Sequence, residues 1–393
     1  KRSATTYTMS IGYLGQEGMM KPAKYDDFNR LNGNLSLSTK VADFLTLRGG
    51  AMYTNSEKRY PNAIFDFISD PWLYLYRWSR LFPTGVLEDG EILSDPYHDT
   101  KQAHTAKDSR QYVNLSLGTT IDFTSNWNFV ADYAYSSQLN QVTRSTPTYT
   151  ARRPWYTPVL RKDENGNPIY VDEEGNITDE GGMEAYQFPV ETIKNKASSY
   201  YYKSTFVSAK HTFNAVTNYQ LSLADAHRFK FMLGANIESY EWDSHWSNKT
   251  DLINELNPQF NFAVGTETVG GDTNWNSQVG FFGRINYSFR DKYLLEANLR
   301  HDATSKFPAH LRWKWYPSFS GGWVISNESF MEPLQPILSF AKLRGSWGSI
   351  GDQSVSNTLY LAMMDIEKNN WLTADGKQYF QMGTPNPISA GIT

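Results

Sequence analysis

Hydrophobic and polar residues alternate one by one over much of this chain. In residues 280–300, Phe281 and Ile285 occupy odd positions and Arg284 an even one, and the neighbouring residues follow the same rule. Successive side chains of a strand point to opposite faces, so a period of two predicts strands. A tight turn at 290–291 divides the segment, which is therefore predicted to be a β-hairpin.

The same alternation recurs along the chain. It predicts about 11 antiparallel strands of roughly ten residues or more, whereas strands of globular proteins usually have about five or six. No segment of comparable length has a helical period. Further strands are indicated around residues 31–38, 45–48, 113–123, 128–136, 229–238 and 342–347.

The predicted connections fall into a short class and a long class that alternate. Short turns are expected near 40–43, 124–126, 224–227 and 290–291, with a Pro-containing link at 329–340. Long segments are expected at 58–107, 146–198, 247–273 and 351–393. Short turns on one rim and long loops on the other are typical of outer-membrane β-barrels. Aromatic residues of apolar parity also lie close to the short turns, where a membrane girdle is expected: Phe123, Trp127, Phe289, Tyr293 and Trp323.

Composition narrows the function classes. The chain has 25 Tyr, 22 Phe and 12 Trp but no Cys, which excludes disulfides, thiolate metal sites and Cys nucleophiles. The 37 basic and 41 acidic residues nearly balance, which argues against a nucleic-acid partner. Mean hydropathy is −0.56, and no apolar run is long enough for a membrane helix. The seven His are scattered, and no catalytic or metal-binding motif is present, so a non-enzymatic protein is expected.

The two strand faces are assigned to different media. The residues of apolar parity, among them Phe281, Ile285 and Tyr287, are predicted to face lipid. The opposite face is predicted to line an aqueous interior, as a substrate path or a contact surface. Its charged members are Arg284, Glu296, Arg300, Asp302 and Arg344.

Residues 300–331 carry a recognisable pattern of motifs. An Arg-x-Asp element and a Ser-Lys-Phe element are followed by Pro-Ser and by Gly-Trp-x-Ile-Ser-x-Glu-x-Phe. The matching positions are Arg300, Asp302, Ser305, Lys306, Phe307, Arg312, Pro317, Ser318, Gly322, Trp323, Ile325, Ser326, Glu328 and Phe330. This pattern resembles the SusC/RagA-type TonB-dependent outer-membrane transporters. Residues 342–353 (KLRGSWGSIGDQ) and 7–20 (YTMSIGYLGQEGMM) resemble further segments of that family. Ala303–Thr304, Trp347 and Asp352 depart from its pattern without breaking the alternation.

The resemblance implies an all-β fold, a partial antiparallel transmembrane barrel with about 11 strands of a barrel of about 22. It also implies import of an oligosaccharide or peptide through a plugged barrel of the Gram-negative outer membrane, energised by TonB. A SusD-like surface lipoprotein would act as a lid. Bacterial single-chain barrels have even numbers of strands, and an open sheet of 11 strands would leave two unpaired edges in lipid. Residues 1–393 are therefore expected to be part of a larger barrel, whose plug, N-terminal domain and closing strands lie outside this chain.

Aromatic residues in the long segments are the candidates for substrate binding, because flat rings stack on sugars and binding residues concentrate on loops. They are Trp72, Tyr74, Tyr76, Trp78, Trp155, Tyr156, Trp242 and Trp246. The alternative is that these rings pack a small core within the loops.

A calcium site is the one cofactor that the sequence suggests. Asp163, Asn165, Asn167 and Glu174 follow an EF-hand-like spacing in segment 163–180. Pro168 stands where the Gly of such a loop belongs, so a solvated hairpin with Asn-Gly and Glu-Gly turns is favoured, and no cofactor is expected.

Two other classes of function stay open on the sequence alone. One is a passive porin-like or adhesin-type barrel, which has the same wall and no plug. The other is a secreted β-rich protein that binds or cleaves glycans. Extraction that depends on detergent would separate the membrane classes from the secreted one.

Overall fold

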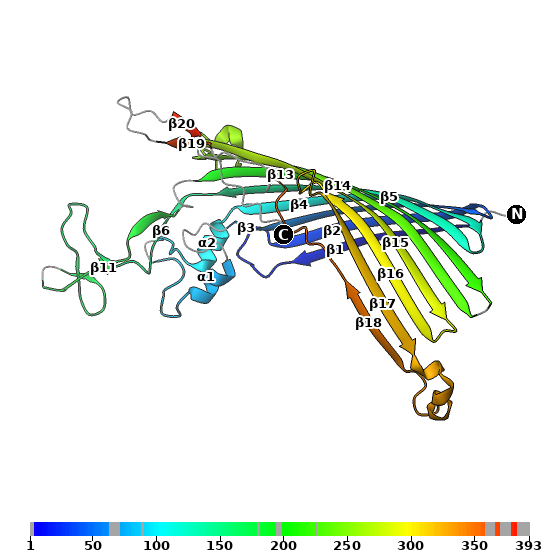
Figure 1. Cartoon of the computed structure of the whole chain (residues 1–393). Coiled ribbons are helices and arrows are strands. Elements are labelled where there is room, and N and C mark those ends of the chain that lie inside the picture. Colours follow the sequence, from blue (N-terminus) through cyan, green and yellow to red (C-terminus); the bar gives the residue numbers. More distant parts are fainter. Residues whose placement is uncertain are drawn as a thin grey trace.

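The computed structural model describes residues 4–62, 71–87, 90–178, 181–193, 199–224, 226–357, 366–369 and 379–382. Within them one antiparallel sheet of 11 strands forms the body of the molecule (Figure 1). Each strand of the sheet pairs with the next one along the chain, in the order β1-β2-β3-β4-β5-β13-β14-β15-β16-β17-β18. The predicted fold class and strand number are therefore confirmed. The strands are β1 Thr5–Glu17, β2 Asp27–Ala42, β3 Leu45–Pro61, β4 Thr105–Thr124, β5 Trp127–Thr146, β13 Tyr200–Leu223, β14 His227–Thr250, β15 Glu267–Phe289, β16 Tyr293–Thr304, β17 Trp313–Val324 and β18 Lys342–Gly348.

The short turns lie at one rim of the sheet, at the right of Figure 1. The turn between β15 and β16 has Arg290 and Asp291 in the left-handed region, at φ 51° and 55°, and the Lys292 amide donates to the Phe289 carbonyl at 3.0 Å. Two central residues of positive φ match the twist of antiparallel strands, which is why such a turn closes a tight hairpin. The predicted link at 329–340 holds the 3₁₀ helix η3 (Ser329–Leu334), which follows η2 (Ile325–Asn327).

The opposite rim carries the long connections, at the left of Figure 1. Between β3 and β4 lie two short helices, α1 (Pro71–Arg77) and α2 (Pro96–Gln102). Between β5 and β13 the described residues form seven short strands: β6 Tyr149–Arg152, β7 Val159–Leu160, β8 Tyr170–Val171, β9 Ile177–Thr178, β10 Met183–Glu184, β11 Tyr186–Gln187 and β12 Val190–Ile193. A separate pair, β19 Ile366–Asn369 and β20 Tyr379–Met382, lies within the long segment predicted at 351–393, of which the residues between and after these strands fall outside the described part.

The bounds of two predicted long connections are wrong. In the segment predicted at 58–107, residues 58–61 belong to β3 and residues 105–107 to β4. The segment predicted at 247–273 differs more. Residues 247–250 continue β14 and residues 267–273 begin β15, so the connection between these strands covers 251–266, with the 3₁₀ helix η1 (Phe260–Phe262) inside it. β14 is longer than expected because its large side chains move from the outer to the inner face near the loop. The alternation of apolar and polar positions, which was used to find the strand, reverses at the same place.

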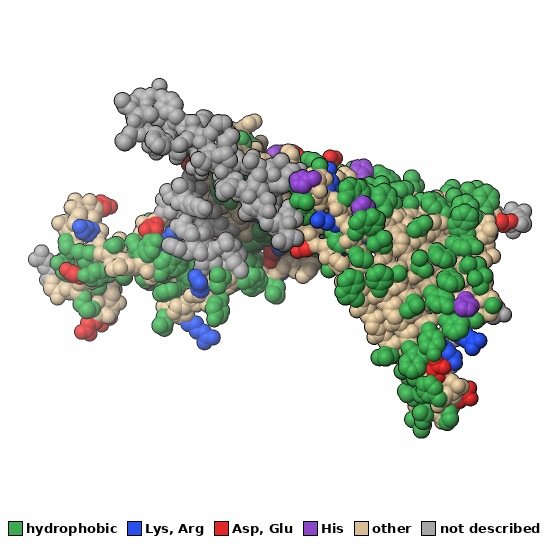
Figure 2. Space-filling model, viewed as in Figure 1, with side chains coloured by type: hydrophobic (Ala, Val, Ile, Leu, Met, Phe, Trp, Pro, Cys, Tyr) green, Lys and Arg blue, Asp and Glu red, His purple; other side chains and the backbone are tan. Residues whose placement is uncertain are grey.

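The register places the alternating apolar residues in the middle of neighbouring strands on one face. Ile285 lies opposite Phe231 on β14 and Ala297 on β16, and Ala297 lies opposite Phe319 on β17. Large hydrophobic side chains on this face stay exposed, including Ile285, Phe319 and Leu233. Figure 2 shows such side chains spread over the right-hand part of the sheet, with few charges among them. Within the described residues, no helix has the length and apolar character needed to cross a membrane.

Candidate functional site

The polar face of the sheet is a network of hydrogen-bonded side chains. The Arg284 Nε donates to Asn298 Oδ1 at 2.7 Å, and the Asn298 amide donates to Glu296 Oε1 at 2.7 Å. All three residues share the face opposite Ile285, as the register of β15 and β16 requires. The structure thus brings together two of the predicted interior charges, Arg284 and Glu296, through an asparagine that the sequence analysis did not single out.

Arg300 and Asp302 form a second group on the same face. The guanidinium donates to both carboxylate oxygens, at 2.9 and 3.1 Å, and lies 5.0 Å from the centre of the Phe282 ring. A Cβ at Gly280 would come within 2.3 Å of Asp302 and 2.8 Å of Arg300, so this glycine makes room for the ion pair. Arg344 lies apart from this group, opposite Gly322 on β17.

A similar arrangement occurs on the first half of the sheet and was not predicted. The Arg48 Nη2 atom lies 2.7 Å from Asp132 Oδ1 and its Nη1 donates to Thr120. Gly118 lies between Arg48 and Asp132 in the register, and a Cβ there would meet both side chains. The interior face therefore contains the same arrangement twice: an Arg–Asp ion pair that packs against a glycine.

The long loops contain a packed aromatic cluster. Tyr74, Trp78, Phe82 and Trp155 contact one another edge to face or tilted, with ring centres 5.2–6.5 Å apart. Such pairs stabilise a small core. Only 6% of Tyr74 is exposed. Three of the predicted binding aromatics thus hold the loops together in this structure, and their contact with substrate stays a prediction.

The other loop candidates lie at the surface. Tyr76 is 87% exposed, Trp72 is exposed on the same helix, and Tyr156 lies beside the Arg153 guanidinium. The structure does not gather these three around one cavity, and their binding role also stays a prediction.

A buried carboxylate lies beneath the aromatic cluster. Asp99 on α2 accepts hydrogen bonds from the Tyr74 hydroxyl at 2.8 Å, from Ser94 at 2.9 Å and from the Tyr149 hydroxyl. Burial raises the pKa of Asp99 to about 6, and these hydrogen bonds oppose the rise. Nearby, burial lowers the pKa of His104, whose ring contacts Ser145, to about 4. Asp99 joins α1, α2 and β6 and was missed because its partners are far apart in sequence.

Trp242 and Trp246 were expected on loops, and that placement is wrong. Both lie within β14 and have the parity of the interior face. Trp242 lies opposite Ser208 on β13 and Asn274 on β15, and Trp246 lies opposite Ser204 and Gly270. The strand backbone therefore holds both rings, and they point to the same side as Asn236 and Met232.

At the short-turn rim, Glu328 explains part of the motif in residues 300–331. Its carboxylate accepts hydrogen bonds from Lys292 Nζ at 2.9 Å, Tyr293 Oη at 2.8 Å and Trp323 Nε1 at 3.1 Å. The hydrogen bond from Lys292 is the largest cause that lowers the pKa of Glu328, to about 2, and those from Tyr293 and Trp323 add to it. Glu328 thus ties the 3₁₀ segment to the ends of β16 and β17.

Within the predicted 163–180 segment, the described residues 163–178 fold as self-contained turns. The Asp163 carboxylate accepts from the backbone amides of Asn165 and Asn167 at 2.9 and 2.8 Å, and Asp172 accepts from that of Asn176 at 2.8 Å. Gly166 and Gly175 both have φ +86°, which Gly adopts without strain. No group of three or more metal-ligating side chains occurs in the part of the chain that the structure describes. Calcium binding here was not favoured and stays untested.

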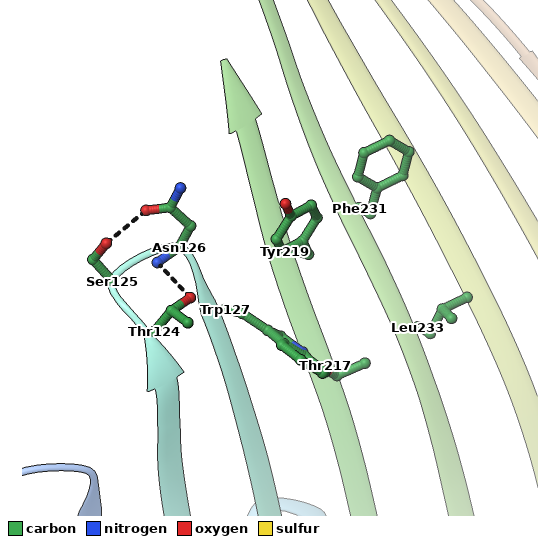
Figure 3. Close-up of a pocket in the computed structure, with 8 residues that line it drawn as sticks. All are labelled: Thr124, Ser125, Asn126, Trp127, Thr217, Tyr219, Phe231 and Leu233. Carbon is green, nitrogen blue, oxygen red and sulfur yellow. Dashed lines mark hydrogen bonds between the residues drawn. The ribbon is translucent and has the colours of Figure 1, made fainter. Parts of the chain in front are cut away.

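A hollow of about 760 Å³ lies on the apolar face, next to the turn between β4 and β5 (Figure 3). Trp127, Thr217, Tyr219, Phe231 and Leu233 line it, and all have the outer parity. The Trp127 Nε1 donates to Thr217 Oγ1 at 2.9 Å, which satisfies the indole beside an apolar surface. Its position on the apolar face makes the hollow a place for lipid chains and not for a polar ligand.

A meandering antiparallel sheet with an apolar outer band, a polar inner face and sorted loops is the wall of an outer-membrane β-barrel. No protein-family model matches the chain. The TonB-dependent receptor SusC of Bacteroides thetaiotaomicron is 22% identical over 98% of this chain, and the TonB-dependent receptor P26 of Formosa agariphila is 24% identical over 97%. The RagAB peptide transporter covers 98% of this chain with a TM-score of 0.66 at 14% identity, which shows the shared fold.

Along nearly its whole length the chain is therefore similar to SusC-like TonB-dependent receptors, proteins of the Gram-negative outer membrane, and it shares their barrel-wall fold. It spans about a third of the length of the curated relatives, 36% of SusC and 34% of P26. It also covers 39% of the RagAB transporter chain.

Proposed function

We propose that this chain is the wall segment of an active nutrient importer, in which a larger, plugged barrel is energised by TonB. The observation that supports the proposal most directly is the alignment with SusC along 98% of the chain, and the separation of an apolar outer band from a polar inner face on β14 to β17 agrees with it. The plug, the N-terminal domain and the remaining strands would lie in other parts of the full-length protein. The role is transport, in line with the receptor and transporter names of the relatives.

The proposed cargo is an oligosaccharide, and the alternative is a peptide, which is what the RagAB peptide transporter is named for. A SusD-like surface lipoprotein would cover the loop rim, where α1, α2 and the short strands β6 to β12 lie. Arg284, Glu296, Arg300, Asp302 and Arg344 would line the path or contact the plug. Most of these charged side chains are already hydrogen-bonded within the wall. They therefore suit a polar lining along which the cargo passes more than a site that binds it with high affinity.

The test is uptake by cells that carry the full-length gene. Deletion of the gene should abolish growth on the imported nutrient, and loss of TonB should have the same effect. Fluorescent oligosaccharides and peptides of matched length, supplied to wild-type and deletion strains, would identify the cargo class. Uptake that persists without TonB would favour the passive porin-like alternative.

The loop aromatics are tested on the same full-length protein. Trp72→Ala, Trp78→Ala and Trp155→Ala are compared for ligand affinity and for protease sensitivity of the loops. Affinity that falls while the loops stay intact would place a ring in the binding site. From the packing of Trp78 and Trp155, we expect these two variants to be cleaved faster.

A further inference from the structure

Strands β13 and β14 are much longer than a membrane requires. Each has 24 residues, and at about 3.3 Å per residue a strand of that length extends roughly 80 Å. The apolar band of a membrane barrel is only about 25 Å tall. A large part of both strands therefore stands outside the membrane, on the side of the long loops.

The outer face of β14 changes character along this extension. Phe231 and Ile237 occupy outer positions in the lower part, and Glu241 and Asp243 occupy outer positions above them. From Ser239 upward the outer positions of β14 are therefore polar, which indicates that this part of the strand stands above the apolar band.

The inner face changes in the opposite sense over the same residues. Its positions carry Trp242 and Trp246 on β14, beside Phe206 and Tyr202 on β13. Phe206 and Trp242 have ring centres 5.6 Å apart at 30°, and Tyr202 and Trp246 have ring centres 6.2 Å apart at 26°. We call these four residues the aromatic tier. All four rings have the inner parity, so they face the interior, whereas Trp275 on β15 has the outer parity at the same height.

Hydrogen-bonding groups adjoin the tier on β4 and β5. Asn140 lies directly opposite Phe206, and its buried Oδ1 has no hydrogen-bond partner among the described residues. Gln138, opposite Ser208, accepts from Arg110 at 2.5 Å and keeps that guanidinium on the same face. The charges below are already paired, because Lys210 Nζ lies 2.9 Å from Glu238. The tier thus offers rings, amides and one guanidinium.

The tier differs from the cluster that packs the loops. Tyr74 and Trp78 order a segment that has no sheet to hold it, whereas β13 and β14 are hydrogen-bonded to neighbours on both sides. Their rings are not needed to fix the backbone. Trp246 is 37% exposed, and Trp242 is half-buried. Flat faces are therefore available to a ligand.

We propose that the aromatic tier is a binding surface for a neutral oligosaccharide; this deepens the proposed function and rests on it. The rings stack on the apolar faces of sugars, and Asn140, Gln138 and Arg110 bond to hydroxyls. The two ring pairs are four residues apart on each strand, or roughly 13 Å, so one sugar ring cannot reach both. A peptide would add to a free strand edge, and β13 and β14 have none.

The experiment uses the purified full-length transporter and a panel of neutral hexasaccharides, with linear α-glucan, β-glucan, mannan and fructan members. Affinity is measured by calorimetry for the wild type, Trp242→Ala, Phe206→Ala and Trp242→Phe. Trp275→Ala is the matched control, since Trp275 lies on the outer face beside the tier and is 63% exposed. We expect binding of at least one hexasaccharide, at least tenfold weaker in both alanine variants, and nearly unchanged in Trp242→Phe and Trp275→Ala.

A second measurement needs no variant. Hydroxyl-radical footprinting of the wild type with the bound hexasaccharide should protect Trp242 and Trp246 and leave Trp275 reactive. Equal affinity of Trp242→Ala and wild type, protection of Trp275 alone, or binding of none of the sugars would overturn the proposal. Failure of the proposed function is a different result, namely uptake of every cargo without TonB. TonB-dependent uptake of peptides but not sugars would retain the importer and reject the sugar tier.

Discussion

Glu328 accepts hydrogen bonds from two strands, β16 and β17, and from the turn that precedes β16. Lys292, Tyr293 and Trp323 converge on one carboxylate, of which only 13% of the side chain is exposed. A charged acceptor makes stronger hydrogen bonds than a neutral one. This residue therefore fixes where β16 and β17 end relative to the short-turn rim.

Glu328→Gln should lower the temperature at which the full-length barrel unfolds, because the amide offers one acceptor oxygen and no charge to Lys292. Glu332→Gln, an exposed change in the same 3₁₀ segment, is the control and should have no effect. The folded pKa of Glu328, about 2, lies below its usual value of 4.5. Its stabilising contribution is thus complete above pH 4.5 and is lost as the pH falls through 2. A transition that does not differ between the two variants, measured by heat-dependent gel migration, would contradict this assignment.

Asp99 and His104 should give the loops two opposite pH dependences. Asp99 has a folded pKa of about 6 against 3.8, so its contribution to stability is lost as the pH rises from 4 to 6. His104 has a folded pKa of about 4 against 6.5, so its contribution is lost as the pH falls from 6.5 to 4. Each pKa shift corresponds to a change of about 3 kcal/mol in the stability of the loops. In the wild type the two pH-dependent changes have opposite signs and should nearly cancel.

Single variants separate these effects. His104→Gln should make the loops more protease-sensitive at pH 6.5 than at pH 4.5, and Asp99→Asn should do the reverse. The measurement is the rate of loop cleavage by a protease that is active over this range, corrected with an unfolded substrate. Parallel pH profiles in both variants would exclude the assignment.

At the scale of the element, the strands assign one medium to each face. Ile285 lies in the middle of the apolar band, between Phe231 on β14 and Ala297 on β16. Its neighbour Asn286 lies on the inner face opposite Glu296. Adjacent positions of one strand should therefore respond very differently to the same charge.

Ile285→Arg should destabilise the barrel by about 2–4 kcal/mol, the cost of a guanidinium near the membrane midplane. Asn286→Arg should cost less than about 1 kcal/mol, because the new charge would face water and Glu296. Folding of the full-length protein into lipid vesicles at graded urea concentrations gives both values. Equal losses would reverse the assignment of the two faces.

The strands were predictable where one face is apolar throughout, as around Phe281 and Leu295, since the period of two is then unbroken. The tops of β13 and β14 were not, because beyond Ser239 the rings of the aromatic tier lie on the inner face and the alternation changes sign. Tyr74, Asp99 and Tyr149 meet across 25 and 50 residues of chain, and no local pattern encodes such a contact. Glu328 belongs to the motif in residues 300–331, but its hydrogen-bond donors could be identified only from the structure.

At the scale of the whole molecule, the described sheet has β1 and β18 as its outermost strands. An unpaired strand edge in hydrocarbon exposes amides and carbonyls that nothing satisfies. The sheet therefore needs further strands, in accordance with its coverage of 36% of SusC.

Residues 1–393 expressed alone are expected to aggregate, or to pair edge to edge, and not to form a compact monomer in detergent. The full-length protein, refolded in parallel, is the control. The checks are heat-dependent gel migration and resistance to trypsin. A protease-resistant, heat-modifiable monomer from residues 1–393 would mean that the sheet closes on itself.

The change of sides on β14 also restricts how the gene can vary in length. Loss of one residue between Ile237 and Trp242 would turn every ring above it to the outside, and the hydrogen-bonded neighbours could not follow. Insertions and deletions within these strands should thus survive only in pairs, matched on the adjoining strand. The turns around Gly166 and Gly175, which complete their own hydrogen bonds, carry no such restriction. Lineages that adapt to new nutrients should therefore differ in length there first.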